Sequence, residues 1–316
     1  MARAARGLKP GARAARNAAL RTVVAGWCVV ATVAASATPS AAWPRPDVDD
    51  LYVVRDLAVG ATPAADGRAA PHVDVYSRWQ GGDRPVVVWI HGGGWSRGSK
   101  DSVGFLPELL IARGFVFVSV GYRLIPDADW FGQASDVAAA LAWVERNIAA
   151  FGGNGGDVHL LGYSAGAHLA ALAALDPNYL AAQGLRRSNV ASVTLLDGFG
   201  YDVDAEASLS RPATAAMYGG VFGSRRAKRY RASVVAAAQV GVWPAEFLVF
   251  ALASDRDSIV RSRLLVPVLG RVGVRVHTRR VRSGAHRDLP AILASASEPS
   301  SLEYLEFLDL QTTTLR

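Results

Sequence analysis

Short apolar runs alternate with longer segments of helical periodicity along most of the chain. Runs rich in β-branched residues predict buried strands, whereas apolar residues three and four positions apart predict helices that bury one face. The predicted strands are His72–Trp79, Pro85–Ile90, Phe115–Val120, Val158–Gly162, Val190–Leu196, Glu246–Ala253 and Val272–Val281. The predicted helices are Ser102–Arg113, Gln133–Phe151, Ala165–Leu175 and Leu302–Leu310. This order indicates βαβ units, and hence an α/β fold with a mostly parallel sheet and helices on both faces.

Residues 198–245 interrupt this rhythm. The segment holds Pro212, several glycines and the basic cluster Arg225–Arg231. We interpret it as an insertion or small cap that covers part of the active site, and the basic cluster as a solvated helix face. With that insertion included, residues 43–316 are expected to form one domain.

The first 42 residues resemble an export signal. Six basic residues and no acidic one precede or flank an apolar stretch of 16 residues from Thr22 to Ala37, and small residues follow it. This stretch is shorter than the roughly 20 residues that span a bilayer, and the small residues suit a cleavage site. We therefore expect a periplasmic or secreted protein without stable membrane insertion after cleavage. The alternatives are an uncleaved N-terminal membrane anchor and an organelle transit peptide.

The charge of the chain does not indicate a nucleic-acid partner. The formal net charge of +7 derives mostly from the first 42 residues, since the rest has 28 basic and 27 acidic side chains. A nearly neutral domain lacks the basic patch that phosphate backbones require. Cys28, within the leader, is the single cysteine, and the six histidines show no metal-binding spacing, so we expect no metal and no organic cofactor.

The strongest chemical motif is Gly162–Gly166, which reads GYSAG and lies between a predicted strand and a predicted helix. In this context G-x-S-x-G forms a sharp turn that holds the serine in strained backbone geometry and exposes its hydroxyl. The two glycines avoid a collision between the arms of the turn. The N-terminus of the following helix favours developing negative charge. Ser164 is therefore the candidate nucleophile.

A second motif, His91–Trp95 (HGGGW), follows directly after the predicted strand Pro85–Ile90. Glycines allow backbone N–H groups to approach a ligand without an intervening Cβ atom. The oxyanion of a tetrahedral intermediate needs two or three such donors, each worth roughly 3–4 kcal/mol in the transition state. We predict that the N–H groups of Gly93, Gly94 and Ala165 form this oxyanion hole, with Gly92 adjoining it.

HGGGW followed about 70 residues later by GYSAG resembles the α/β-hydrolase superfamily. More narrowly, the chain resembles the hormone-sensitive-lipase-like and the feruloyl-esterase/kynurenine-formamidase-like esterases. GYSAGAHLA is closer to the formamidase-like branch, because Tyr163 and Gly166-Ala167 depart from the hormone-sensitive-lipase pattern. The resemblance covers roughly residues 73–310 and implies an α/β-hydrolase fold and a serine esterase.

The resemblance also implies the chain order serine, acid, histidine for a catalytic triad. Three histidines precede Ser164 and are excluded by this order: His72, His91 and His159. His168 lies one turn into the helix after the serine and is expected to have a structural role. His286 follows the last strand in a loop, whereas His277 lies within that strand, so His286 is the predicted base.

Three carboxylates are candidates for the triad acid. The resemblance implies a Gly-x-x-Asp pattern before an apolar pair, and Ser254–Val260 matches it at Asp257 with Ser254 in place of the glycine. Asp257 is therefore the predicted acid. Asp255 in the same segment is one alternative. Asp197, at the end of the preceding strand, is the other, because some hydrolases carry their acid there.

The predicted function is hydrolysis of a small-molecule carboxylic ester through an acyl-enzyme on Ser164. One alternative is an amidase of the arylformamidase type with the same triad. An alternative of another class is a non-catalytic α/β-hydrolase scaffold that serves as a binding module. The sequence predicts neither the acyl-chain preference nor the oligomeric state.

Overall fold

The computed structural model describes residues 51–60, 70–78, 82–209, 211–238 and 245–314. All of these residues belong to the compact unit Pro46–Arg316. The predicted signal segment, residues 1–42, lies outside the described residues. None of the helices in the described ranges combines the length and the hydropathy needed to cross a bilayer.

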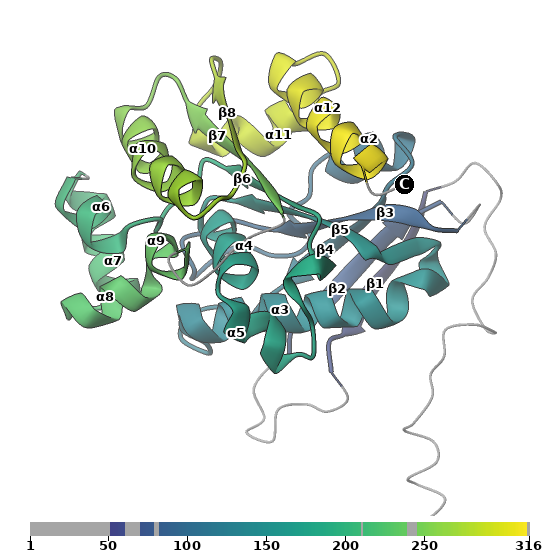
Figure 1. Cartoon of the computed structure of the whole chain (residues 1–316), viewed down its shortest axis with the longest axis horizontal. Helices are drawn as coiled ribbons and strands as arrows, with labels where there is room; N and C mark the ends of the chain where they lie inside the picture. The colour runs from purple at the N-terminus through teal and green to yellow at the C-terminus, as the bar shows by residue number, and fades with distance from the viewer. Residues whose placement is uncertain (1–50, 61–69, 79–81, 210, 239–244, 315–316) are drawn as a thin grey trace, which may run out of the picture. The chain divides into compact units, whose positions relative to one another are not determined.

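Eight strands in the described part of the chain form one sheet in the order β1-β2-β4-β3-β5-β6-β7-β8 (Figure 1). β2 runs antiparallel to both β1 and β4, and all other neighbours are parallel. The strands are β1 (Tyr52–Ala58), β2 (His72–Ser77), β3 (Arg84–Ile90), β4 (Val116–Gly121), β5 (Gly153–Tyr163), β6 (Ser192–Leu196), β7 (Glu246–Leu252) and β8 (Val276–Val281). The predicted α/β fold with a mostly parallel sheet is confirmed.

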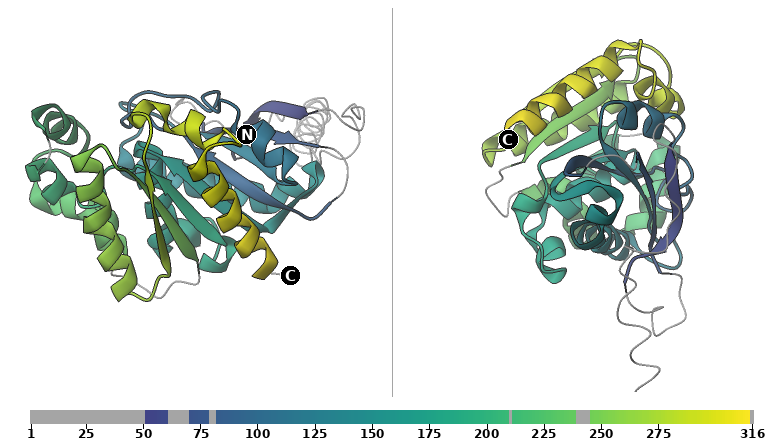
Figure 2. Two further views of the ribbon diagram at one scale, coloured as in Figure 1. Left: turned by 90° about the horizontal axis from the view of Figure 1, so that it is seen from above. Right: turned by 90° about the vertical axis from the view of Figure 1, so that its right-hand side faces the viewer.

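Helices cover both faces of this sheet (Figure 2). One face carries α2 (Leu106–Ala112), α11 (Leu289–Leu293) and α12 (Pro299–Thr314). The other carries α3 (Trp130–Asn147), α4 (Ala165–Leu175), α5 (Pro177–Ala182) and α10 (Arg256–Arg271). Short 3-10 turns are η1 (Ile148–Phe151), η2 (Arg187–Asn189) and η4 (His286–Asp288).

The segment between β6 and β7 is largely helical where it is described. It contains α6 (Val203–Leu209), α7 (Pro212–Phe222), α8 (Arg226–Ala232) and α9 (Val234–Ala237). The basic cluster lies on and before α8, where Arg226 and Arg229 face Asp204 at 3.4 and 3.6 Å. These arginines therefore help to hold α8 against α6.

The register of the central strands brings distant residues to one edge of the sheet. Ile90 pairs with Gly162, and Tyr163 pairs with Leu196. The residues that follow β3, β5 and β6 consequently leave the sheet side by side. Ligands bind at the carboxyl edge of the parallel strands in open α/β folds, so a ligand site is expected at this edge.

Most predicted elements correspond to observed ones within a few residues. The predicted helix Ala165–Leu175 has the observed bounds of α4. Several observed elements were not predicted from the sequence: β1, α5, the helices α6 to α9, α11, and α10, which contains Pro267 in its interior. Proline is unfavourable inside helices, so this segment lacked a helical signature.

Candidate active site

Ser164 lies at a sharp turn between β5 and α4. Its backbone φ of +55° falls in the left-handed region, which is costly for a residue with a side chain. A Cβ atom on Gly162 would lie 2.5 Å from the carbonyl oxygen of Gly166, and one on Gly166 would lie 2.1 Å from that of Ile90. Only glycine therefore fits at either side of the turn, as the motif predicts.

The HGGGW loop passes next to this turn. Gly93 has a φ of +126°, and a Cβ atom there would lie 2.0 Å from the carbonyl oxygen of Arg97. The Gly93 carbonyl accepts hydrogen bonds from the N–H groups of Ser96 and Arg97 at 3.3 and 3.0 Å, so the loop folds back on itself. As the first residue of α4, Ala165 has an N–H group without an intrahelical acceptor.

A half-buried lysine fixes the end of this loop to the sheet. Lys100 Nζ lies 3.0 Å from a carboxylate oxygen of Asp74, which is fully buried on β2, and 2.8 Å from Asp56. The Lys100 carbonyl accepts a bond from the Ser119 hydroxyl on β4 at 2.6 Å. Burial opposes the charge of the lysine, but the hydrogen bonds that it donates to Asp56 and Asp74 raise its pKa overall. The glycine loop is thereby tied to the antiparallel part of the sheet.

His168 braces the same loop from the other side. The indole N–H of Trp95 donates to His168 Nδ1 at 3.2 Å, so Nε2 carries the ring proton and donates to the Ala232 carbonyl at 2.7 Å. Complete burial lowers the pKa of His168 to about 4, which keeps the ring neutral. The structure thus places His168 in the packing around α4, the structural role that the sequence predicts.

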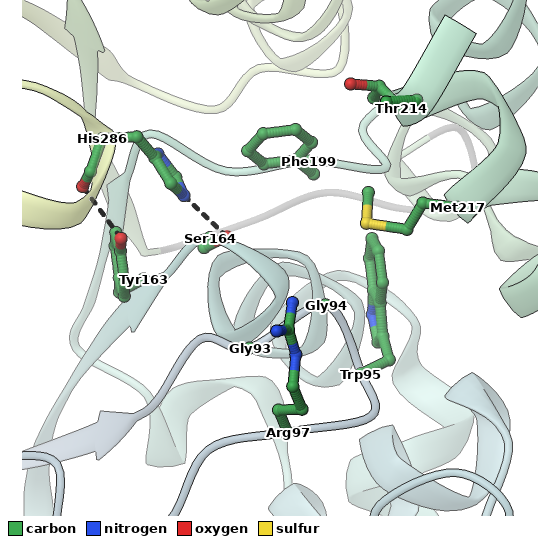
Figure 3. Close-up of a pocket in the computed structure, with 11 residues that line it drawn as sticks. Gly93, Gly94, Trp95, Arg97, Tyr163, Ser164, Phe199, Thr214, Met217 and His286 are labelled. Carbon is green, nitrogen blue, oxygen red and sulfur yellow. Dashed lines mark hydrogen bonds between the residues drawn. The ribbon is translucent and has the colours of Figure 1, made fainter.

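His286 joins Ser164 to a carboxylate. The Ser164 hydroxyl donates to His286 Nε2 at 2.9 Å (Figure 3). On the other side of the ring, His286 Nδ1–H donates to Asp197 Oδ2 at 2.7 Å. The Tyr163 ring stacks on the imidazole, and its hydroxyl donates to the His286 carbonyl at 2.8 Å. The edge of Phe199 packs against the imidazole with ring centroids 5.2 Å apart. These contacts fix the ring between the hydroxyl and the carboxylate.

Asp197 is held as an anion by groups from α10. Its Oδ1 accepts bonds from the Ser258 hydroxyl at 2.5 Å and from Arg261 Nη2 at 3.1 Å, and Arg261 is itself almost fully buried. Burial alone would raise the pKa of Asp197, but the bond from His286 and the charge of Arg261 lower it overall. The guanidinium also lies over the Phe199 ring, 3.8 Å from its centroid.

The structure corrects the prediction that Asp257 accompanies the histidine. Asp257 lies in the first turn of α10, not in a loop, and its nearest cation is Arg211 at 3.9 Å. Asp255 caps the same helix by accepting the N–H of Asp257 at 2.9 Å. The alternative Asp197 is the carboxylate beside His286. His277, the weaker histidine candidate, faces Glu246 at 2.9 Å.

Sequence reasoning missed the two residues that support Asp197. Ser258 and Arg261 are 61 and 64 positions away from it along the chain, so no local pattern connects them. A weak signal was present, because the arginine and serine fall on one helical face of a segment that follows a buried strand.

A cavity of about 490 Å³ opens beside Ser164. This volume is within the range of small-molecule sites. Its lining is mostly apolar, and the residues that form it are Gly93, Gly94, Trp95, Arg97, Tyr163, Ser164, Phe199, Ala213, Thr214, Met217 and His286. Three of these come from α7, so the segment between β6 and β7 supplies one wall of the cavity (Figure 3).

A buried glutamate attaches this wall to the sheet. Glu206 on α6 accepts bonds from the N–H groups of Gly200 at 2.9 Å and Asp202 at 3.0 Å, and from the hydroxyl of Tyr218 on α7. Burial raises the pKa of Glu206 despite these donors. Within the described ranges, no group of histidine, cysteine, aspartate or glutamate side chains is placed to hold a metal ion.

Comparison with known proteins finds partial sequence similarity to esterases and to a formamidase. The sequence profile of a protein family described as BD-FAE matches residues 73–200. Esterase LipC of Mycobacterium tuberculosis is 40% identical over 101 residues, which cover 31% of this chain and 25% of that protein. Kynurenine formamidase of Danio rerio is 40% identical over 90 residues, which cover 28% of this chain and 29% of that protein. The chain thus spans about a quarter of the length of the curated relatives it matches.

The structural likeness extends over nearly the whole chain. The crystal structure of esterase B from Lactobacillus rhamnosis superposes with a TM-score of 0.68 and 22% identity, covering 96% of this chain and 98% of that one. A further structure of the same esterase is of the form inhibited by a tributyrin phosphonate. At this identity the likeness shows a shared fold.

Proposed function

We propose that this chain, which has the α/β-hydrolase fold and a BD-FAE region at residues 73–200, hydrolyses carboxylic esters through an acyl-enzyme on Ser164. The observation that carries the proposal is the continuous hydrogen-bonded series from the Ser164 hydroxyl through His286 to Asp197, with bonds of 2.9 and 2.7 Å. This series opens onto a mostly apolar cavity, which suits the acyl or alcohol part of an ester.

In the first step the Ser164 oxygen attacks the ester carbonyl carbon while His286 Nε2 takes the hydroxyl proton. Asp197 accepts the Nδ1 proton in its hydrogen bond, holds the reactive tautomer and stabilises the imidazolium. The imidazolium then gives the proton to the departing alkoxide, which leaves as the alcohol. Water repeats the sequence on the acyl-enzyme and releases the acid.

The negative charge that develops on the carbonyl oxygen needs donors on one side of Ser164. We propose that the N–H groups of Gly93, Gly94 and Ala165 supply them. Both glycines line the cavity, and Ala165 begins α4, whose N-terminus adds a favourable dipole.

The test is turnover of 4-nitrophenyl butyrate by wild type and by Ser164→Ala. We expect kcat to fall by about 10⁶-fold, because the nucleophile is lost, while the circular dichroism spectrum is unchanged. A fluorophosphonate probe should label wild type and leave the variant unlabelled. Ser188→Ala, at an exposed serine on η2, is the matched control and should keep full activity. Esterase activity retained by Ser164→Ala would refute the proposal, and an unlabelled wild type would favour a binding module.

A second candidate function is hydrolysis of an aryl formamide. The similarity to kynurenine formamidase over 90 residues favours it, and the same nucleophile, base and carboxylate would act on an activated amide. Rates on N-formylkynurenine and on a short aryl ester, measured with one enzyme preparation, separate the two functions. A kcat/KM for the formamide above that for the ester would make the amidase the principal activity.

We also propose that the protein is exported. The basic residues and the apolar stretch before Trp43 support this proposal, and an uncleaved segment would make the protein membrane-anchored instead. Fractionation of cells that express the full chain, followed by N-terminal sequencing, distinguishes a cleaved, an anchored and a retained form.

A further inference from the structure

We propose that Arg97 selects esters that carry an anionic group near the scissile bond. This inference rests on the proposed esterase function and adds a substrate class to it. The chemistry that Arg97 would recognise is a carboxylate, on either the acyl part or the alcohol part of the ester.

The position of Arg97 is determined by the loop that carries the glycines. Its N–H group donates to the Gly93 carbonyl at 3.0 Å, and the close approach of its own carbonyl leaves no room for a side chain at Gly93. The backbone of Arg97 is thus fixed relative to the oxyanion donors. The side chain extends from this loop toward Gly94 and Ser164 (Figure 3).

Arg97 brings a full positive charge to an otherwise mostly apolar lining. The described residues that form the cavity wall include no aspartate and no glutamate. Within the described ranges, no carboxylate lies within ion-pair distance of the Arg97 guanidinium. Other arginines near the site do have acidic partners: Arg261 faces Asp197 at 3.1 Å, and Arg287 faces Asp288 at 3.6 Å.

Arg97 lies beside the reactive serine and has no acidic partner among the described residues. Its position therefore suits a ligand that brings a negative charge of its own. The guanidinium fork can bind a carboxylate through two parallel hydrogen bonds, and Trp95 and Phe199 offer apolar surfaces for the rest of the molecule. The charge also attracts anions from solution, an effect that weakens as salt is added.

The experiment compares matched pairs of anionic and neutral esters. 4-Acetoxybenzoate and 4-acetoxybenzamide test a carboxylate on the alcohol part, whereas mono-4-nitrophenyl adipate and 4-nitrophenyl hexanoate test one on the acyl part. For each pair the quantity is the ratio of kcat/KM, anionic to neutral. We expect Arg97→Gln to lower at least one ratio by about fivefold, and the pair that responds identifies the source of the carboxylate.

Two further variants separate a local contact from a change of net charge. Arg287→Gln removes an equal charge from an exposed position that lines a different cavity, and it should leave both ratios unchanged. Arg97→Lys keeps the charge and should retain a salt-dependent preference. In wild type the preference should decline between roughly 0.01 and 1 M salt, as the Debye length falls from about 30 to about 3 Å.

The inference is overturned if both ratios in Arg97→Gln stay within about twofold of wild type, or if Arg287→Gln lowers them equally. Failure of the esterase function itself looks different. In that case wild type shows no hydrolysis of either ester of a pair above the rate that Ser164→Ala also gives.

Discussion

Replacing Asp197 by asparagine tests the assignment of the carboxylate. The side chain is 2% exposed and accepts three hydrogen bonds, of which the one from His286 Nδ1 is 2.7 Å long. An amide keeps the shape and can still accept from Arg261 through its oxygen. Its NH₂ group would then face Nδ1 and favour the tautomer with the proton on Nε2. That tautomer cannot take the proton of Ser164.

The expected loss follows from this change of tautomer. A triad with the acid converted to its amide loses about 10⁴-fold in kcat, which corresponds to about 5.4 kcal/mol of transition-state stabilisation. Asp257→Asn is the matched control. Asp257 lies on α10 and is 3.9 Å from its nearest cation, Arg211, so its loss should change kcat by less than about threefold.

The assay is initial-rate hydrolysis of 4-nitrophenyl butyrate across pH 5 to 9, after circular dichroism and thermal melting have verified that both variants fold. Arg261 loses its counter-charge in Asp197→Asn, and a buried cation without a partner costs about 3–5 kcal/mol of stability, so a lower Tm is expected. A folded Asp197→Asn enzyme with near wild-type kcat would refute the reasoning. A loss of 10³-fold or more in Asp257→Asn would refute it even if Asp197→Asn did not fold.

Two other predictions concern stability. Gly166→Ala places a Cβ atom 2.1 Å from the Ile90 carbonyl oxygen, so it should lower the free energy of unfolding, measured in urea, by more than about 3 kcal/mol. The control Ala167→Gly should lower it by about 1 kcal/mol, and equal effects of the two substitutions would contradict the steric argument. His168 has a pKa of about 4 when folded and an ordinary value when unfolded, so the unfolded chain binds the extra proton below pH 6.5 and stability falls by about 3 kcal/mol down to pH 4. His168→Gln should flatten this dependence in urea melts at several pH values, and an unchanged slope would show that another group titrates.

The strands of the central sheet and the turn at Ser164 could be predicted because their causes are local. The β-branched run of β3 and the two glycines around the serine impose their geometry within a few residues. The same holds for the histidine: a loop that follows the last strand of a parallel sheet reaches the edge where the turn lies, and the structure brings His286 there.

The error at Asp257 arose because α10 was not recognised. Pro267 lies inside this helix and argues against a helix in the sequence, so the residues after β7 were interpreted as a loop able to carry the acid. In the structure they begin a helix that sends Ser258 and Arg261 back to Asp197. Contacts across more than 60 positions depend on how the strands are ordered in the sheet, and a single sequence does not specify that order.

The link between Lys100 and Asp74 has a practical consequence for anyone who wishes to transfer or improve this site. The loop that carries the proposed oxyanion donors is anchored through Lys100 to β2, which runs antiparallel to its neighbours and contributes nothing to the cavity wall described above. If only the cavity residues were transferred to another scaffold, the glycine loop would lose the contacts of Lys100 with Asp56 and Asp74 that hold it in place. Directed evolution for faster turnover should accordingly include positions 56, 74 and 100, which inspection of the cavity would not select.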